Sequence, residues 1–256
     1  MGQQTALITG ASGGIGAELA KLCAAGGFNL VLVARDAERM AQLAAGLARA
    51  HGIQVRVLAA DLADPLAPAR LFGQLQPAPI DILINNAGFG LRGAFAETDW
   101  AADARLMQVN MTAPAHLTKL FLPGMIERRR GRILNVASTA AFVPGPFMAM
   151  YYSSKAFLLS FSEAVANEVK GTGVTVTVLC PGPTRTEFFE RAGIAGSKLS
   201  QGPSMTAADV AAEGYRAMMA GKTQVIAGAR NRWLMRGVRI APRGMVADFT
   251  RRLNLE

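Results

Sequence analysis

Short apolar runs and longer alanine-rich segments alternate along this chain. The apolar runs are rich in Val, Ile and Leu and too short for typical helices, so we predict strands at residues 5–9, 28–35, 54–61, 80–88, 131–138 and 174–182, with a seventh at 223–228. Helical periodicity fills residues 14–26, 36–51, 65–76, 100–129, 151–171 and 207–221. Nearly continuous apolar strands alternating with helices predict an α/β fold with a parallel sheet covered on both faces.

Ligands of such sheets bind beyond the carboxyl ends of the strands, and a glycine-rich stretch follows the first predicted strand. The stretch TGASGGIG, residues 9–16, places glycines at positions 10, 14 and 16. Glycines permit a tight turn there and let backbone N–H groups approach a pyrophosphate at a helix N-terminus. The spacing G-x-x-x-G-x-G differs from the general dinucleotide fingerprint, and a close strand-to-helix packing turn is the alternative interpretation.

The second predicted strand ends in LVARD, which places Arg35 before Asp36. In dinucleotide-binding sheets an acidic residue here binds the ribose hydroxyls, whereas an arginine accommodates a 2′-phosphate. Arginine offers bidentate donors suited to phosphate, so we expect NADP(H) in preference to NAD(H). Asp36 has a second interpretation, as the N-cap of the next helix.

The stretch MAMYYSSKAF, residues 148–157, contains two tyrosines and a lysine. In a helix, residues four apart share a face, so Tyr151 lies over Lys155 while Tyr152 turns about 100° away. A neighbouring ammonium stabilises a phenolate, which would let Tyr151 act as a proton donor near neutral pH. Taken alone, a Tyr and a Lys at this spacing also occur by chance on many helices.

The bulk composition limits the function classes. The chain has 256 residues, of which 51% are apolar and 18% charged, as in a soluble globular protein with a substantial core. We find no apolar run of membrane-spanning length and no basic n-region of a secretory signal, so we expect a cytoplasmic protein. Cys23 and Cys180 are isolated, and no His, Cys and carboxylate cluster has metal-ligand spacing, so we expect no metal.

The net charge of +9 is concentrated near the C-terminus. Residues 221–256 carry eight Lys or Arg residues against two acids, which is six of the nine net charges. Apolar residues such as Trp233 and Ile240 lie between the arginines, which favours an amphipathic surface element over a nucleic-acid reader. A peripheral contact with an anionic membrane is one interpretation. A solvated helix or an oligomer contact is the other.

Several motifs together resemble those of the short-chain dehydrogenase/reductase family. They occur in the order and at the spacing typical of that family: Thr9, Gly10, Gly14, Ile15, Gly16, Asp61, Asn85, Asn86, Ala87, Gly88, Asn110, Ser138, Tyr151, Lys155, Pro181 and Gly182. The resemblance covers residues 5–186 at least. The stretch LNVASTAAFVPGPFMAMYYSSKAFLLSFSEA is also similar to a subgroup of NADP-linked ketone reductases.

The resemblance implies a single Rossmann domain over residues 1–256 with a seven-stranded parallel sheet, a substrate flap at 187–206 and a basic C-terminal extension at 222–256. Tyr151 would be the acid/base, Lys155 would bind the nicotinamide ribose, Ser138 the substrate oxygen, and Asn110 a relay water. The implied cofactor-binding set is Gly10, Ser12, Gly14, Ile15, Gly16, Arg35, Asp61, Leu62, Asn86, Ala87, Gly88, Tyr151, Lys155, Pro181, Thr184 and Thr186. Gly13 stands where many NADP-using relatives carry a second basic residue, so Arg35 is left to recognise the phosphate.

The implied activity is hydride transfer between NADP(H) and a carbonyl compound or secondary alcohol, in a homodimer or homotetramer. Residues 139–150 have no charged side chain, and an apolar wall there, with Phe142 and Phe147 joined by Phe188, suggests a hydrophobic ketone or aldehyde. Those side chains could equally pack the loop itself. An NADP-binding redox sensor or scaffold that acts through its basic tail is the alternative function.

Overall fold

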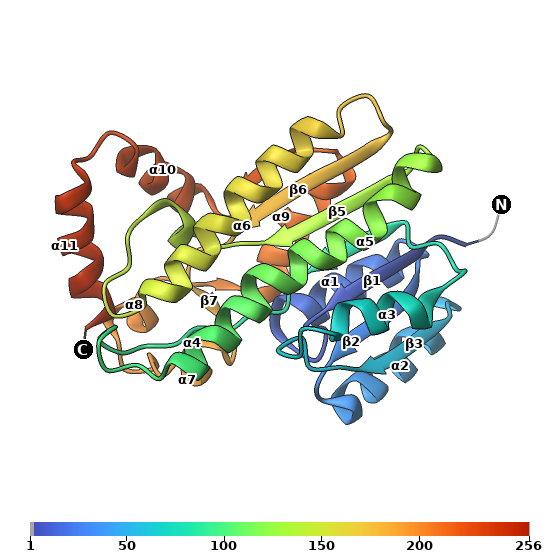
Figure 1. The fold of residues 1–256 in the computed structure, drawn as a ribbon, viewed down its shortest axis with the longest axis horizontal. Coiled ribbons are helices and arrows are strands. Elements are labelled where there is room, and N and C mark those ends of the chain that lie inside the picture. Colours follow the sequence, from blue (N-terminus) through green and yellow to red (C-terminus); the bar gives the residue numbers. More distant parts are fainter. Residues whose placement is uncertain (1–2, 256) are drawn as a thin grey trace.

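The computed structural model describes residues 3–255, which form one α/β Rossmann-like domain (Figure 1). The sheet order is β3-β2-β1-β4-β5-β6-β9, and all neighbouring strands are parallel. The strands are β1 (Thr5–Thr9), β2 (Asn29–Ala34), β3 (Val55–Ala59), β4 (Ile82–Asn85), β5 (Gly131–Val136), β6 (Val174–Cys180) and β9 (Gln224–Ile226). The predicted seven-stranded parallel sheet is therefore confirmed. The chain order reverses between β1 and β4, which creates a crevice at their carboxyl ends.

Helices cover both faces of the sheet, as the apolar strands require. One face packs against α1 (Gly14–Ala25), α2 (Ala37–His51) and α9 (Ala207–Met219), whose core residues include Leu19, Met40 and Val210. The other face packs against α3 (Ala67–Leu75), α5 (Ala113–Glu127) and α6 (Ala149–Glu168), with Leu71 and Leu117 in the second core. Each strand is thus held between two apolar layers, and this fixes the positions of the loops that follow its carboxyl end.

The predicted helix over residues 100–129 is divided by a π-helical segment. The chain forms α4 (Trp100–Met107), the π-helical residues Gln108–Thr112, and then α5. Pro114 has no N–H and cannot donate to the carbonyl of Asn110 four residues earlier, so the regular hydrogen-bond ladder is interrupted at that point. The interruption turns Asn110 toward the loop after β4.

The segments after β6 lie beyond the carboxyl ends of the strands. Short strands β7 (Thr184–Arg185) and β8 (Met205–Thr206) pair with each other and enclose two short helices, α7 (Phe188–Arg191) and α8 (Lys198–Gln201). The helices α10 (Ala229–Val238) and α11 (Arg243–Asn254) follow β9 and lie at the end of the molecule opposite the N-terminus (Figure 1). Within residues 3–255, no helix is both long enough and apolar enough to cross a membrane.

Gly16 permits the close contact between α1 and the turn after β1, and this gives a stability prediction. A Cβ on Gly16 would overlap the Gly10 carbonyl oxygen and the Asn86 side-chain amide. Gly16→Ala should therefore lower the free energy of unfolding by about 1–3 kcal/mol, as overpacking does. Urea denaturation of the cofactor-free protein measures it.

Gly46→Ala is the matched control, because it makes the same substitution inside a helix. Gly46 lies in α2, and a Cβ there meets nothing within 4 Å. This variant should be more stable than wild type by about 0.5–1 kcal/mol, since alanine favours helix. Equal unfolding midpoints for the two variants would contradict the close-packing role of Gly16.

Candidate active site

A large cavity of about 1800 Å³ opens at the carboxyl ends of the strands. It extends from the turn after β1, past the start of α6, to α10 and α11. Seventeen of the predicted site residues line it: Gly10, Ser12, Gly14, Ile15, Arg35, Asp61, Leu62, Asn86, Ala87, Gly88, Ser138, Tyr151, Lys155, Pro181, Thr184, Thr186 and Phe188. Gly16, Asn110, Phe142 and Phe147 lie outside the lining. The fold therefore brings segments far apart in sequence to one site.

The turn between β1 and α1 has the properties of an anion-binding helix N-terminus. Gly10 and Gly14 adopt φ values of +66° and +54°, which favour glycine. Across the described residues 3–255, no side chain caps the start of α1, whose N-cap is Gly13. The first backbone N–H groups of this helix therefore face the cavity without a side-chain acceptor. Uncapped N–H groups and the helix dipole fit a pyrophosphate.

This turn is tied to the end of β4. The Thr9 hydroxyl accepts hydrogen bonds from the backbone N–H groups of Asn86 and Ala87, at 3.0 and 3.1 Å. The Asn86 side-chain amide in turn donates to the carbonyls of Thr9 and Gly10, at 3.0 and 3.1 Å. These four hydrogen bonds hold the edges of the crevice at a fixed separation.

The two charged residues at the end of β2, Arg35 and Asp36, have different positions: one lines the cavity and the other caps α2. The Asp36 carboxylate accepts a hydrogen bond from the Arg39 backbone N–H at 3.0 Å. Asp36 is therefore the N-cap of α2, which was the second interpretation of this residue in the sequence. Arg35 is exposed and lines the cavity. Its guanidinium is the cation next to the place where an adenosine ribose would lie in such a sheet. In the loop after β3, Asp61 lines the cavity and pairs with Arg105 at 3.3 Å.

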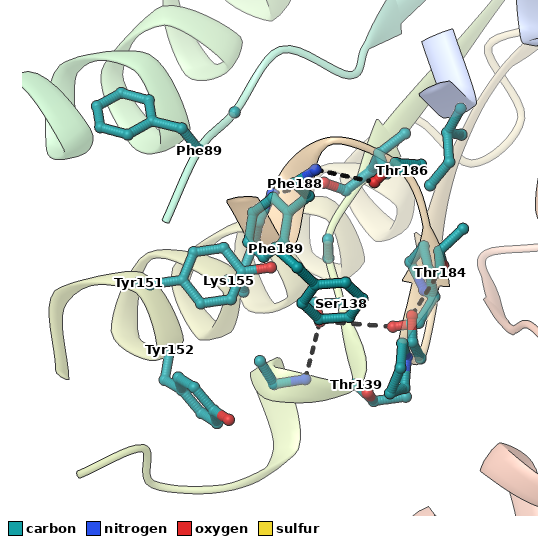
Figure 2. Close-up of a pocket in the computed structure, with 18 of the residues that line it drawn as sticks. Phe89, Ser138, Thr139, Tyr151, Tyr152, Lys155, Thr184, Thr186, Phe188 and Phe189 are labelled. Atoms are coloured by element: carbon teal, nitrogen blue, oxygen red, sulfur yellow. Dashed lines mark hydrogen bonds between the residues drawn. The ribbon is translucent and has the colours of Figure 1, made fainter. Parts of the chain in front are cut away.

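Tyr151 and Lys155 lie on the first turns of α6, and Figure 2 shows Tyr151 beside Ser138 in the cavity. Burial raises the pKa of Tyr151, and a hydrogen bond with Ser138 opposes that rise. The Lys155 ammonium donates a hydrogen bond to the Val136 carbonyl at 2.9 Å, and burial lowers the pKa of Lys155 to about 8. Both side chains are therefore neutral or close to changing protonation state near pH 8.

The expected effect of Lys155 on the Tyr151 pKa is not present in this arrangement. The ammonium nitrogen lies 5.9 Å from the centre of the Tyr151 ring, and its hydrogen bond goes to the main chain of β5. Desolvation of the phenol is the dominant influence, so the pKa of Tyr151 moves up, not down. The shared helix face of the two residues was predicted correctly, but the direction of the shift was not.

Asn110 is buried and connects three segments. Its side-chain oxygen accepts from the Phe89 N–H at 3.1 Å, and its side-chain nitrogen donates to the Phe89 carbonyl and the Ser154 hydroxyl, at 2.9 and 3.0 Å. The side chain therefore fixes the loop after β4 against α6. It lies behind Gly88 on the side of Lys155, because a Cβ on Gly88 would meet both Asn110 and Lys155 within 3.3 Å.

The two predicted apolar wall residues Phe142 and Phe147 do not line the cavity, which corrects that expectation. Phe142 packs against the buried cluster of Ala137 and Leu158, and the Arg251 guanidinium lies 4.9 Å from the Phe147 ring centre. Phe147 has a φ of +65°, which turns its side chain out of the regular direction of the loop. Backbone conformation of this kind has no signature in the sequence pattern.

The apolar lining includes Val143 and Met148 from the predicted apolar segment at residues 139–150, and several of its other members are residues for which the sequence suggested no role in the pocket. Phe89 and Met148 lie at the tyrosine end, and α10 and α11 contribute apolar walls at the open end: Trp233, Leu234, Val238, Met245 and Phe249. Phe188, which was predicted, packs against Tyr151 with ring centres 5.2 Å apart. For the wall residues of α10 and α11, the one signal in the sequence was the apolar character of the segment at residues 222–256.

Comparisons with known proteins agree with this geometry. A family model for short chain dehydrogenases matches residues 4–194. The bovine protein named dehydrogenase/reductase SDR family member 7B is 38% identical over 200 residues, covering 75% of this chain and 62% of that protein. The chain belongs to the short-chain dehydrogenase family. It spans a little over three fifths of the length of the first curated relatives that it matches.

Three solved structures are similar over almost the whole chain. A short-chain dehydrogenase from Sphingobium yanoikuyae in complex with NADPH has a TM-score of 0.84 at 35% identity, covering 92% of this chain and 93% of that one. A bulky-bulky ketone specific alcohol dehydrogenase from Comamonas testosteroni has a TM-score of 0.80 at 31% identity, with 93% of each chain covered. A short chain dehydrogenase/reductase from Burkholderia phymatum in complex with NAD has 0.82 at 25%, covering 91% and 92%.

Proposed function

We propose that the protein is an oxidoreductase that uses NADP(H) to reduce a hydrophobic ketone or aldehyde, or to oxidise the corresponding secondary alcohol. The observation that carries the proposal is the single cavity joining the uncapped start of α1 to the buried Tyr151, Ser138 and Lys155. Family membership supports the hydride-transfer chemistry. The described part of the chain has no group of three or more metal-ligating side chains.

The residues of this chain would perform the proton chemistry of the reaction. When bound, the nicotinamide supplies or accepts the hydride. In reduction, Tyr151 donates the proton of its hydroxyl to the substrate oxygen as negative charge develops there. Ser138 donates a second hydrogen bond to that oxygen and holds it in line with the phenol. The Lys155 ammonium provides positive charge nearby and binds the ribose hydroxyls.

Tyr151 is protonated throughout the neutral range, as the acid of a reduction must be. An ordinary phenol is already protonated there, and burial raises the pKa of Tyr151 further. The raised pKa makes it a weaker acid, so proton transfer relies on the hydrogen bond from Ser138 and the charge of Lys155 at the substrate oxygen. In the oxidative direction the same group must accept a proton, which the Lys155 charge assists once the ligands fill the cavity. Asn110 would act as a positioning residue, because it fixes the loop next to Lys155 through Phe89 and Ser154.

The preference for NADP(H) rests on Arg35. It is the cation at the end of β2 that lines the cavity, while Asp36 is engaged as a helix cap. The NADPH-bound relative supports this preference, whereas the NAD-bound relative shows that the fold admits either dinucleotide. We therefore expect the side chain at the end of β2 to decide the cofactor.

The apolar lining is the basis for a hydrophobic substrate. In the flap at residues 187–206, Phe188 on α7 packs against Tyr151, and Phe189 packs against Phe188 (Figure 2). The wall continues through Val143, Met148 and Ile194 to the apolar faces of α10 and α11. A small polar ketone would leave most of this apolar wall exposed to water, whereas a bulky apolar carbonyl compound would cover it. The name of the Comamonas relative is in line with this.

Replacement of each tyrosine tests the proposed reaction. Tyr151→Phe keeps the ring and removes the acid, so kcat for ketone reduction should fall by about 10²–10⁴-fold with the NADPH dissociation constant unchanged. Steady-state kinetics and cofactor fluorescence titration measure the two quantities.

Tyr152→Phe is the matched control for the tyrosine test. Tyr152 also lines the cavity, but its hydroxyl donates to the Asn254 side chain of α11 at 3.1 Å. The loss in kcat should be less than about tenfold, since only one neutral hydrogen bond is removed. Similar losses in the two variants would reject Tyr151 as the acid.

Arg35→Ala tests the cofactor preference. A charged hydrogen bond to a phosphate contributes about 1.5–3 kcal/mol, so the NADPH dissociation constant should rise about tenfold to a hundredfold while that of NADH changes little. Isothermal titration calorimetry gives both constants. Arg49→Ala is the control, because Arg49 is exposed in the last turn of α2 and does not line the cavity. A wild-type protein that binds NADH more tightly would overturn the assignment.

The pH dependence of reduction should report on Lys155. Burial depresses the pKa of Lys155 to about 8, so the ammonium is present below that pH and is lost as the pH rises through it. Because the charge stabilises the developing alkoxide, kcat/KM for ketone reduction should decrease above about pH 8. In Lys155→Arg this decrease should disappear, since a guanidinium stays charged. A decrease that persists in this variant would assign the ionisation to another group.

A further inference from the structure

The outer surface of α10 and α11 exposes an unusual number of large apolar side chains. Between residues 233 and 249 the exposed fractions are 70% for Trp233, 51% for Leu234, 88% for Ile240, 68% for Met245 and 54% for Phe249. We call this surface the α10–α11 face. A cluster of exposed large side chains on one surface marks an interaction site more often than isolated ones do.

Arginines surround these apolar side chains. Residues 229–254 contain seven arginines and one acid, Asp248. The guanidinium of Arg236 lies 5.0 Å from the Trp233 ring centre, a cation–π pair at the surface. Arg239 and Arg243 are exposed at the junction of the two helices. Trp, Leu and Phe alternating with arginines are typical of elements that lie in a membrane interface.

The opposite side of α11 holds the helix to the protein. Val246, Thr250 and Asn254 recur every four residues and are buried. The Thr250 hydroxyl donates to the Pro144 carbonyl at 2.6 Å, and the Asn254 amide donates to the Pro146 carbonyl at 2.9 Å. The helix is therefore fixed on the loop that precedes Tyr151, and its exposed apolar residues are not needed for that attachment.

The position of Ile240 separates two explanations for the exposed residues. Trp233, Leu234, Met245 and Phe249 line the mouth of the cavity, so a bound substrate could cover them in part. Ile240 does not line the cavity and is the most exposed large apolar residue of the described chain. A substrate in the cavity would leave Ile240 exposed, whereas a larger partner could cover it.

We propose that the α10–α11 face binds the surface of an anionic lipid bilayer. The net charge of +6 over residues 229–254 complements acidic headgroups, and each arginine near such a surface adds about 1 kcal/mol of attraction. Trp233 and Ile240 enter the headgroup region, and the basic side chains remain at the phosphates. In this orientation the cavity mouth faces the lipid.

The orientation has a consequence for the substrate, which rests on the proposed function. An apolar ketone dissolved in the bilayer reaches Tyr151 along the walls formed by α10 and α11 without crossing water. The substrate class is then a membrane-partitioned carbonyl compound. Membrane binding itself needs no turnover and can be tested separately.

The full-length protein is mixed with vesicles of phosphatidylcholine, or of phosphatidylcholine with about one third phosphatidylglycerol, and sedimented. Binding should require phosphatidylglycerol and be released as salt rises to ~0.5 M, where screening is strong. The chain has two tryptophans, so Trp100→Phe leaves Trp233 as a single reporter. Its emission should shift to shorter wavelength on binding.

Two sets of variants identify the surface. The triple variant Arg236→Gln, Arg239→Gln, Arg243→Gln should weaken vesicle binding by more than about tenfold, given the attraction per arginine. The control variant Arg49→Gln, Lys170→Gln, Lys222→Gln removes the same charge from exposed positions outside α10 and α11 and should bind like wild type. Turnover of a small soluble ketone should be unchanged in both, and Ile240→Asn should reduce the shift in Trp233 emission.

Three results would overturn the proposal. The first is equal binding by the two triple variants, which would make the attraction non-specific. The second is no binding to the acidic vesicles together with a dimer, seen by light scattering, that Ile240→Asn dissociates; this would assign the face to a second copy of the chain. The third is the absence of both vesicle binding and self-association. None of them depends on turnover, so the proposed function would stand or fall independently.

Discussion

The hydrogen bonds between the end of β1 and the end of β4 are the constraint on which the site depends. Four of them join Thr9 and Gly10 to Asn86 and Ala87 across the crevice where the strand order reverses. They fix the position of the glycine turn so that the start of α1 faces the cavity. Gly16 allows the helix to approach this junction closely. The π-helical segment brings Asn110 against the loop after β4 and against Ser154 of α6, so the glycine turn and the start of α6 are held by the same loop.

Two adjacent tyrosines show how a helix separates tasks. The 100° turn between successive residues directs Tyr151 into the cavity beside Ser138 and directs Tyr152 to Asn254 on α11. The first lies in the cavity at the candidate site, and the second is hydrogen-bonded to α11, which also lines the cavity. The tail is therefore continuous with the site, and its hydrogen bonds with the loop before α6 couple its position to that of Tyr151.

Much of the fold could be predicted from the sequence because its causes are local. The apolar strands and the glycine turn each have a signature within a few residues, and the residues at the strand ends meet because parallel strands place them on one edge. The misplaced residues depend on longer-range causes. Phe147 turns away because of its backbone conformation and the contact with Arg251, and the direction of the Tyr151 pKa shift depends on burial by segments distant in sequence. The walls from α10 and α11 could not be placed without knowing where the tail packs.

The basic segment at residues 222–256 contains both the cavity walls of α10 and α11 and the exposed apolar surface. Its charge alone allows a solvated helix, an oligomer contact or a membrane contact, which is why composition could not choose among them. In the structure, Val246, Thr250 and Asn254 on one side of α11 are buried against the protein. The other side carries apolar residues around the cavity mouth. A solvated helix gains nothing from exposing Trp233 and Ile240 beside arginines, since each exposed apolar side chain costs hydration free energy. An acidic interface satisfies both the charge and the apolar surface at the same place.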